Sequence, residues 1–184
     1  QDVVPSTTAR LTRHAIYYIM LHPPTVFGVT NSECLRTALR AREGENVNLY
    51  TFIKNMKEQM QSLKMDPNMM HRFINQDFSG GEKKKNEVLH LKILKPKFLL
   101  IDELDSGLDV DSLRIVCQNI KDYLEENKDV SVLLITHYSR ILDLLKPDYV
   151  HEMIRGSIVK TGPYSLAKEI EESGYLRVNE VSEA

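Results

Sequence analysis

Two short segments restrict the fold of this chain more than any other part of its sequence. The first runs from Phe78 to Lys83 (FSGGEK) and the second from Phe98 to Glu103 (FLLIDE). The continuous apolar run of the second segment predicts a buried strand that ends at two carboxylates, Asp102 and Glu103. In open α/β sheets, ligands bind beyond the carboxyl ends of the strands. The second segment therefore predicts a nucleotide site at the edge of an α/β sheet.

The composition is that of one soluble globular domain with its own core. The chain has 184 residues, of which 42% are apolar and 27% are charged, and its formal net charge is -2. A net charge this close to zero gives no sign of a nucleic-acid binder, and no apolar run approaches the roughly 20 residues that cross a bilayer. Cys34 and Cys117 lack metal-ligand spacing and are expected to be small buried side chains. We therefore expect no nucleic-acid partner and no direct membrane insertion.

Changes in composition divide the chain into four ranges. Residues 1–26 are expected to be an irregular N-terminal segment, whose basic start is only weakly like a transit peptide. Residues 27–78 are expected to form a helical subdomain, residues 79–176 an α/β core and residues 177–184 a tail. The Met-rich apolar positions of the second range are most simply core, although a partner surface is an alternative.

Hydrophobic periodicity and capping residues predict the helices and strands. Ser32 and Ser79 are expected to begin helices, the second through a capping box S-x-x-E formed with Glu82. Helices are expected over 32–39, 49–63, 79–95, 109–125, 139–145 and 165–172, and buried strands over 98–101 and 130–135. Residues 149–160 predict a hairpin. Strands that alternate with helices indicate a mostly parallel sheet, which the hairpin is expected to extend at one edge.

Asp102 and Glu103 are the carboxylates best placed for chemistry. Asp102 would bind Mg²⁺ directly or through water, and Glu103 would orient and polarise an attacking water molecule. The alternative is that an Asp-Glu pair at the end of a strand only begins a solvated loop. The neighbouring motifs favour the catalytic interpretation.

Ser79, Gly80 and Gly81 open a predicted helix. Glycine has no Cβ atom, so a phosphate can approach the backbone, and the start of a helix offers unpaired N–H groups with partial positive charge. A plain capping box is an equally good interpretation of these residues alone.

Asp109, His137 and a short lysine run complete the set of candidate residues. Asp109 ends the stretch SGLD and is also a good N-cap for the next helix. His137 follows the second predicted strand, where it would reach a γ-phosphate, although a structural histidine is the alternative. Lys83, Lys84 and Lys85 point in different directions on a helix and are expected to be solvated.

In this order the motifs resemble the ABC ATPase superfamily and, within it, the SufC family, the ATPases of the SUF iron–sulfur cluster assembly system. The resemblance rests on the signature FSGGEKK from Phe78 and on ELDSGLD from Glu103, which is similar to the family's E-x-D-S-G-L-D. It also rests on THYSRILD from Thr136 and KPDYVH from Lys146. The similarity covers about Phe27 to Tyr175.

The resemblance implies a partial ABC ATPase nucleotide-binding domain with an inserted helical subdomain, and it implies ATP and Mg²⁺ as ligands. Asp102 would be the Mg²⁺ residue, Glu103 the catalytic carboxylate and His137 the switch histidine. The residues implied to contact ATP held by a second ATPase subunit are Ser79, Gly80, Gly81, Glu82 and the D-loop residue Asp109.

The resemblance also implies partners and a compartment. Two ATPase subunits would close on ATP and remodel a SufB–SufD-like scaffold. Met56, Met60 and Met65 would lie near the scaffold contact. The compartment would be the cytoplasm of a prokaryote or the plastid stroma.

The chain departs from the family pattern at three points. No Gly-Lys dipeptide occurs, so the P-loop pattern G-x-x-x-x-G-K-[ST] is not met, and the chain alone is expected neither to bind nor to hydrolyse ATP. Leu21 stands where the family has its Q-loop glutamine, and Leu104 stands where it has a small polar residue. The pattern fits an N-terminally incomplete SufC ATPase; a non-catalytic scaffold-binding subunit and an ABC transporter nucleotide-binding domain are the alternatives.

Overall fold

The computed structural model describes residues 16–44 and 46–173, which fall into two compact units. The first unit extends to Thr136 and the second begins at His137. Each unit has its own sheet and helices. Among the described residues, no helix combines the length and the apolar character needed to cross a membrane.

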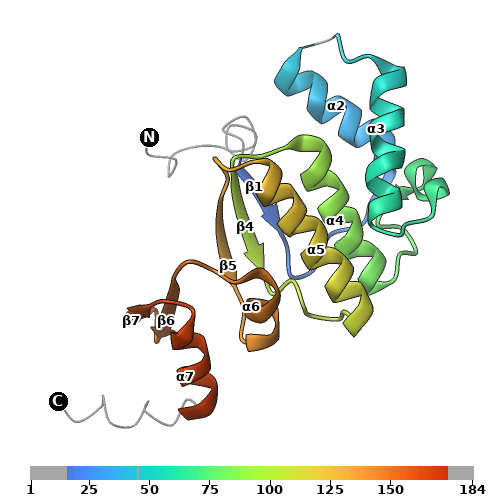
Figure 1. The fold of residues 1–184 in the computed structure, drawn as a ribbon. Coiled ribbons are helices and arrows are strands. Elements are labelled where there is room, and N and C mark those ends of the chain that lie inside the picture. The colour runs from blue at the N-terminus through green and yellow to red at the C-terminus, as the bar shows by residue number, and fades with distance from the viewer. Residues whose placement is uncertain (1–15, 45, 174–184) are drawn as a thin grey trace. The chain divides into compact units, whose positions relative to one another are not determined.

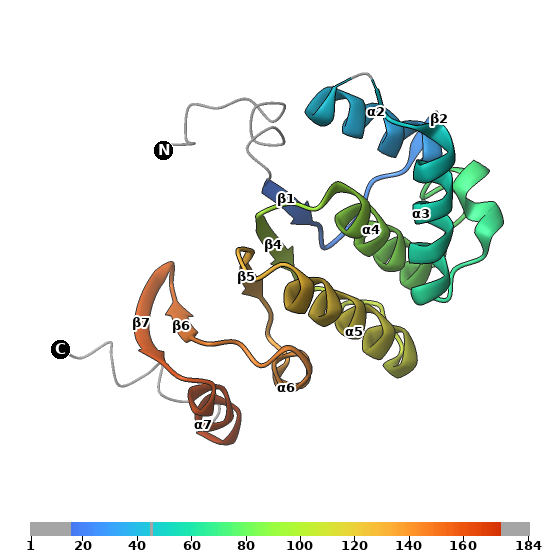
Figure 2. The same cartoon turned by 45° about the horizontal axis from the view of Figure 1, so that its top comes forward.

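The first unit contains a parallel sheet of three strands, in the order β1-β4-β5. The strands are β1 (Ile16–Ile19), β4 (Phe98–Asp102) and β5 (Ser131–Ile135). Helices α4 (Gly80–Leu94) and α5 (Val110–Glu126) lie on the same side of this sheet (Figures 1 and 2). The expected parallel α/β arrangement is confirmed. Strand β1 lies inside the range 1–26, which was expected to be irregular, so that expectation does not hold for the whole range. A strand of four residues is too short to show the alternation of apolar and polar side chains by which a strand is predicted.

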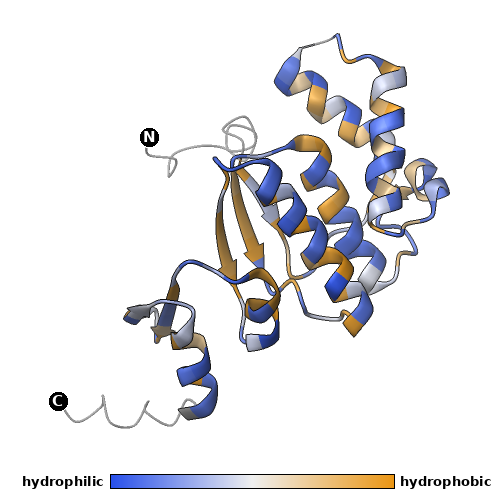
Figure 3. Ribbon diagram, in the orientation of Figure 1, coloured by the Kyte–Doolittle hydropathy of each residue, from blue (hydrophilic) through white to orange (hydrophobic). Residues whose placement is uncertain are grey.

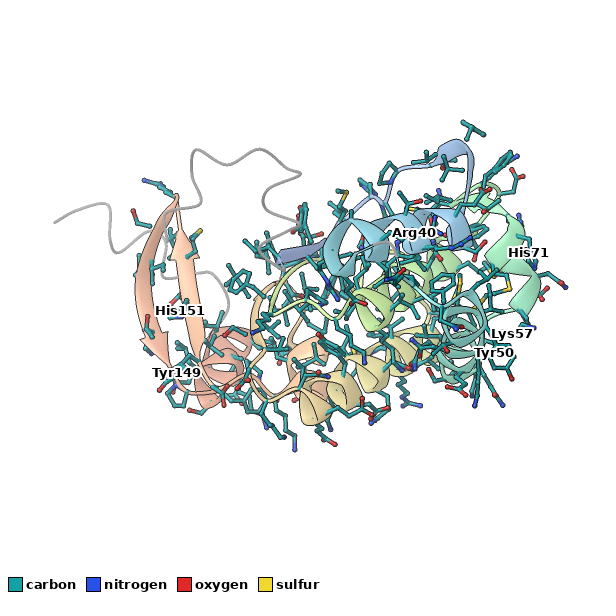
Figure 4. All side chains as sticks on the ribbon, turned by 90° about the horizontal axis from the view of Figure 1, so that it is seen from above. Arg40, Tyr50, Lys57, His71, Tyr149 and His151 are labelled. Carbon is teal, nitrogen blue, oxygen red and sulfur yellow. The ribbon has the colours of Figure 1, made fainter. Side chains whose placement is uncertain are left out.

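A helical part joins β1 to α4. Its elements are β2 (Val26–Thr30), α2 (Asn31–Glu43), α3 (Leu49–Ser62), the 3₁₀ helix η1 (Pro67–His71) and β3 (Phe73–Ile74). Strands β2 and β3 pair antiparallel. Tyr50, at the start of α3, lies at the surface and is 79% exposed (Figure 4).

The N-cap of α2 differs from the expected Ser32. Thr30 is the N-cap, because its hydroxyl accepts from the Glu33 amide at 3.3 Å while the Glu33 carboxylate accepts from the Thr30 amide at 3.0 Å. The spacing Thr-x-x-Glu makes this reciprocal pair possible, whereas the residue three positions after Ser32 is Leu35. The capping box therefore decides where the helix begins.

The core of the first unit includes the methionines of the helical part. Met56 and Met60 are fully buried and Met65 nearly so. The core interpretation of these methionines is confirmed, and the expectation that they lie near a scaffold contact stays a prediction. Other fully buried side chains of this unit include Leu35, Leu63, Leu89, Leu91, Leu99, Ile101 and Ile120.

Strand β5 is less buried than its apolar sequence predicted. Leu133 is 47% exposed and Ile135 is 50% exposed. Within the described residues β5 is an edge strand of the sheet, and helices α4 and α5 both cover the same side of that sheet (Figure 1). Figure 3 shows β4 and β5 as the most hydrophobic ribbons of the molecule. Continuous apolarity thus predicted the strand correctly but not its burial.

The second unit consists of a hairpin between two helices. Its elements are α6 (Ser139–Leu145), β6 (Val150–Ile154), β7 (Ser157–Gly162) and α7 (Ser165–Ser173). Arg155 and Gly156 form the turn with φ angles of 51° and 82°, as two-residue hairpin turns require. His151 and Thr161 are register partners whose side chains meet at 2.8 Å (Figure 4). Among the described residues the hairpin forms a two-stranded sheet, and the expectation that it extends the parallel sheet stays a prediction.

Candidate nucleotide site

The end of β4 presents Asp102 and Glu103 at the carboxyl edge of the parallel sheet. Asp102 is the last residue of β4. Glu103 follows with a φ of 42°, and its amide donates to the Ile135 carbonyl at 2.9 Å. This left-handed backbone turns the chain away from the strand direction directly after the two carboxylates. Asp102 and Glu103 therefore lie where a ligand of an α/β sheet is expected.

Tyr18 is a neighbour of Asp102 that the sequence did not reveal. Its hydroxyl donates to Asp102 Oδ2 at 2.7 Å, and this hydrogen bond raises the pKa of the Tyr18 phenol. The contact exists because β1 pairs parallel to β4, with Tyr18 opposite Leu100. A tyrosine in a short strand gives no local signal of such a partner.

The loop that follows β4 also contacts the end of β5. Thr136, the residue after β5, donates its hydroxyl to Asp105 Oδ1 at 3.4 Å. Asp105 lies between Glu103 and the turn at Gly107, whose φ is 73°. The carboxyl ends of β4 and β5 therefore share one polar edge.

The Ser79–Gly81 turn begins α4 as a complete capping box. The Ser79 hydroxyl accepts from the Glu82 amide at 3.2 Å, and the Glu82 carboxylate accepts from the Ser79 amide at 2.7 Å. A Cβ atom on Gly80 would lie 3.3 Å from the Gly107 carbonyl oxygen. The structure therefore brings the Ser-Gly-Gly turn and the Ser-Gly-Leu-Asp turn together, although they lie far apart in sequence.

Asp109 is the N-cap of α5, as expected. Its carboxylate accepts from the Ser112 amide and from the Ser112 hydroxyl, both at 2.8 Å. These hydrogen bonds lower the pKa of Asp109. Ser112 lies next to both Asp109 and Gly81, because a Cβ atom on Gly81 would lie 3.4 Å from Ser112 Oγ.

The lysine run differs from expectation at its middle member. Lys84 is 2% exposed and donates to the Met20 carbonyl oxygen. Burial lowers the pKa of Lys84, while Glu87 and then Asp102 oppose this shift. Lys84 is buried because it lies on the face of α4 that turns toward β1. The expectation that all three lysines are solvated is therefore wrong for Lys84.

His137 is the first residue of the second unit. Its ring packs on that of Tyr138, with the centroids 3.9 Å apart. A role for His137 beside Asp102 and Glu103 stays a prediction.

The oxygen donors at the sheet edge fit Mg²⁺ chemically. Among the described residues, no group of three or more His, Cys, Asp or Glu side chains could enclose a metal ion. Mg²⁺ is commonly held by one or two carboxylates together with water and substrate phosphates rather than by a protein cage. Asp102, which is half-exposed at the strand end, matches that kind of site.

Curated relatives resemble this chain along most of its length. The chain is 42% identical over 177 residues to vegetative protein 296 of Bacillus subtilis, covering 95% of the chain and 67% of that protein. It is 43% identical over 173 residues to the probable ATP-dependent transporter ycf16 of Cyanophora paradoxa, covering 92% and 66%. It is 40% identical over 164 residues to the probable ATP-dependent transporter SufC of Escherichia coli, covering 87% and 65%. The chain thus spans about two thirds of the length of these relatives. No family model matches the chain.

Solved structures show the same fold. The dimeric structure of a bacterial ABC transporter cassette matches with a TM-score of 0.71 at 15% identity, covering 86% of this chain and 68% of that one. A dimeric post-hydrolysis structure of an ATP-binding cassette bound to ADP and Pi matches with a TM-score of 0.72 at 16% identity, covering 87% and 68%. At these identities the structures establish the fold, and the curated relatives establish the family. The chain belongs to the ABC ATPase family and is a homologue of the SufC-like ATP-binding proteins.

Proposed function

We propose that this chain carries the signature from Phe78 and the Walker B segment, which ends in Asp102 and Glu103, of a SUF-type ATPase. That ATPase would hydrolyse ATP in a closed dimer to remodel a SufB–SufD-like scaffold for iron–sulfur cluster assembly. The observation that carries the proposal is the meeting of the Ser79–Gly81 turn with the Gly107 turn. In the same unit, Asp102 ends β4 and Glu103 follows it directly. The identity to SufC of Escherichia coli supports the choice among ABC ATPases.

The roles of the carboxylates follow from their place at the sheet edge. Asp102 would hold Mg²⁺, directly or through water, and Mg²⁺ would neutralise charge on the phosphates. Glu103 would orient the attacking water and accept its proton. Tyr18 already donates to one oxygen of Asp102, so it would fix the orientation of that carboxylate.

The start of α4 would act on ATP held by a second subunit. The Gly80 and Gly81 backbone and the first-turn N–H groups of a 15-residue helix suit a phosphate. The residues assigned to this contact are Ser79, Gly80, Gly81, Glu82 and Asp109, with His137 assigned to the γ-phosphate. The dimeric cassettes of the same fold support a two-subunit site. The compartment would be a prokaryotic cytoplasm or the plastid stroma.

The test compares this chain alone with a joined chain, defined here as the 184 residues preceded by a P-loop-bearing segment of an ABC ATPase. The backbone and lysine of a P-loop cradle the β- and γ-phosphates, and this sequence has no Gly-Lys pair. We expect calorimetry to show no MgATP binding at micromolar concentrations by the chain alone. The joined chain is expected to bind MgATP and to hydrolyse it.

Two outcomes would contradict this assignment. Micromolar binding by the chain alone would mean that the phosphates are held without a P-loop. Binding without hydrolysis by the joined chain would favour a non-catalytic scaffold-binding subunit.

A further inference from the structure

Three helix ends meet around a hollow at the C-terminal end of α4. Helix α2 ends at Gly44, whose φ of 98° turns the chain away from the helix axis. Helix α4 ends at Lys95, which has a left-handed φ of 46°, and α3 begins at its N-cap, Asn48. Because α2 and α4 stop here while α3 starts, the helix backbones leave the space between them open. A cavity of about 470 Å³ lies there.

The cavity has the size and the floor of a small-molecule site. Such sites usually measure roughly 300–1,000 Å³ and combine apolar side chains with a few polar groups. Leu39, Phe52 and Ile93 line the cavity and are 9%, 5% and 3% exposed; these three side chains are called the floor. Val47 adds a half-buried apolar side chain from the loop between α2 and α3 (Figure 1). An apolar group of a ligand would therefore lie on side chains that the core already holds in place.

The polar side chains around the floor offer mainly hydrogen-bond donors. Asn48 Oδ1 accepts from the Thr51 amide at 3.0 Å, and Asn55 Oδ1 accepts from Gln59 Nε2 at 3.2 Å. Each of these two asparagines, which both line the cavity, thus has its Nδ2 group left to donate to a ligand. The ammonium of Lys95, an exposed residue of the same lining, can also only donate. The lining therefore suits a ligand that accepts hydrogen bonds.

The charges around the cavity favour an anion. Glu43 is the carboxylate of the lining within the described residues, and Arg42 Nη2 donates to its Oε1 at 2.8 Å. The negative charge of Glu43 is therefore balanced by its neighbour. An anionic ligand would gain a charge-assisted hydrogen bond from Lys95, whereas a cationic ligand would face the Lys95 ammonium.

We propose that this cavity binds a small carboxylic acid with an apolar body, in its carboxylate form. The carboxylate accepts hydrogen bonds from Asn48, Asn55 and Lys95, and the apolar body lies on the floor. The cavity is at the opposite end of α4 from the Ser79–Gly81 turn. This binding site goes beyond the proposed nucleotide function and does not depend on it.

NMR chemical shifts of the 184-residue chain test the site, with benzoate as the probe and no nucleotide present. We expect saturable shifts of the Val47, Thr51 and Lys95 amides with a Kd of about 1 mM, a modest affinity for a ligand of this size. Benzyl alcohol keeps the ring without the charge, and acetate keeps the charge without the ring. Each should bind at least about fivefold more weakly than benzoate.

Three results with these probes would overturn the proposal. The absence of shifts at the three amides in about 10 mM benzoate, roughly ten times the expected Kd, would mean that the cavity takes no such ligand. Benzyl alcohol binding as tightly as benzoate would remove the anion from the ligand class. Acetate binding as tightly as benzoate would remove the apolar body.

Two replacements test whether benzoate binds in the cavity itself. Lys95→Asn removes the ammonium, and asparagine tolerates a left-handed backbone. We expect this variant to bind benzoate at least about threefold more weakly. Asn55→Leu removes a donor at similar size and should weaken binding about as much.

Lys146→Asn is the matched control. Lys146 also ends a helix with a left-handed φ, here 47°, and it lies in the second unit. The replacement should leave the benzoate Kd unchanged. An equal loss in Lys146→Asn, or unchanged affinity in both Lys95→Asn and Asn55→Leu, would place benzoate elsewhere and overturn the proposal. These outcomes are independent of whether the chain serves an ATPase.

Discussion

Replacing Glu103 by Gln in the joined chain is expected to lower ATP turnover at least about 100-fold while leaving ATP affinity almost unchanged. A positioned general base contributes about 10²–10⁴ to a rate. Gln keeps the size and a hydrogen-bonding oxygen of Glu but cannot accept the proton of the attacking water. Steady-state hydrolysis gives the turnover, and calorimetry with MgATP gives the affinity.

Glu125→Gln is the matched control for this variant. Glu125 lies exposed on α5, away from the edge of the sheet, and the same chemical change there should leave turnover within about twofold. Unchanged turnover in Glu103→Gln would remove Glu103 from the catalytic role. Loss of both turnover and ATP affinity would instead assign it to binding.

Replacing Glu87 by Gln is expected to change the pH dependence of stability. Burial raises the pKa of Glu87 from 4.5 to about 7, against the lowering effects of the Met20 amide and Lys84. The folded chain therefore binds this proton more tightly than the unfolded chain, so Glu87 costs stability as pH rises from about 4.5 through 7. At 1.36 kcal/mol per pKa unit, this cost reaches up to about 3 kcal/mol. Gln has no titrating proton, so the replacement removes this dependence of the unfolding free energy on pH.

Urea unfolding at pH 4.5 and at pH 8 measures the effect. The difference in unfolding free energy between Glu87→Gln and the parent chain should shift by up to about 3 kcal/mol in favour of the variant at pH 8. Glu58→Gln, at an exposed position of α3, should show a shift below about 0.5 kcal/mol. If the difference in unfolding free energy between the variant and the parent chain were the same at both pH values, the pKa of Glu87 would be ordinary. The Glu87 side chain would then be exposed to water in solution.

The features that the sequence predicted correctly are those set by neighbouring residues. The capping box of Ser79 and Glu82, the strand at 98–101 and the N-cap role of Asp109 each depend on a few adjacent positions. Local chemistry determines such features almost regardless of the rest of the fold. The Thr-x-x-Glu spacing of Thr30 and Glu33 is a local signal of the same kind.

The contacts that the sequence did not predict depend on which distant strands and helices meet. Tyr18 reaches Asp102 across 84 positions, and Lys84 reaches Met20 across 64. Neither contact can be inferred without knowing that β1 lies beside β4 and α4. The burial of Lys84 also contradicts the usual expectation for a lysine run, because its charge finds a backbone carbonyl and Glu87.

The most direct test of the central claim is the sedimentation mass of the joined chain carrying Glu103→Gln, with and without MgATP. If the Ser79–Gly81 turn completes a site on a second subunit, ATP that is bound but not hydrolysed should hold two copies together. The account predicts a monomer without nucleotide and a dimer with MgATP. A species that binds ATP and stays monomeric at every concentration would contradict it.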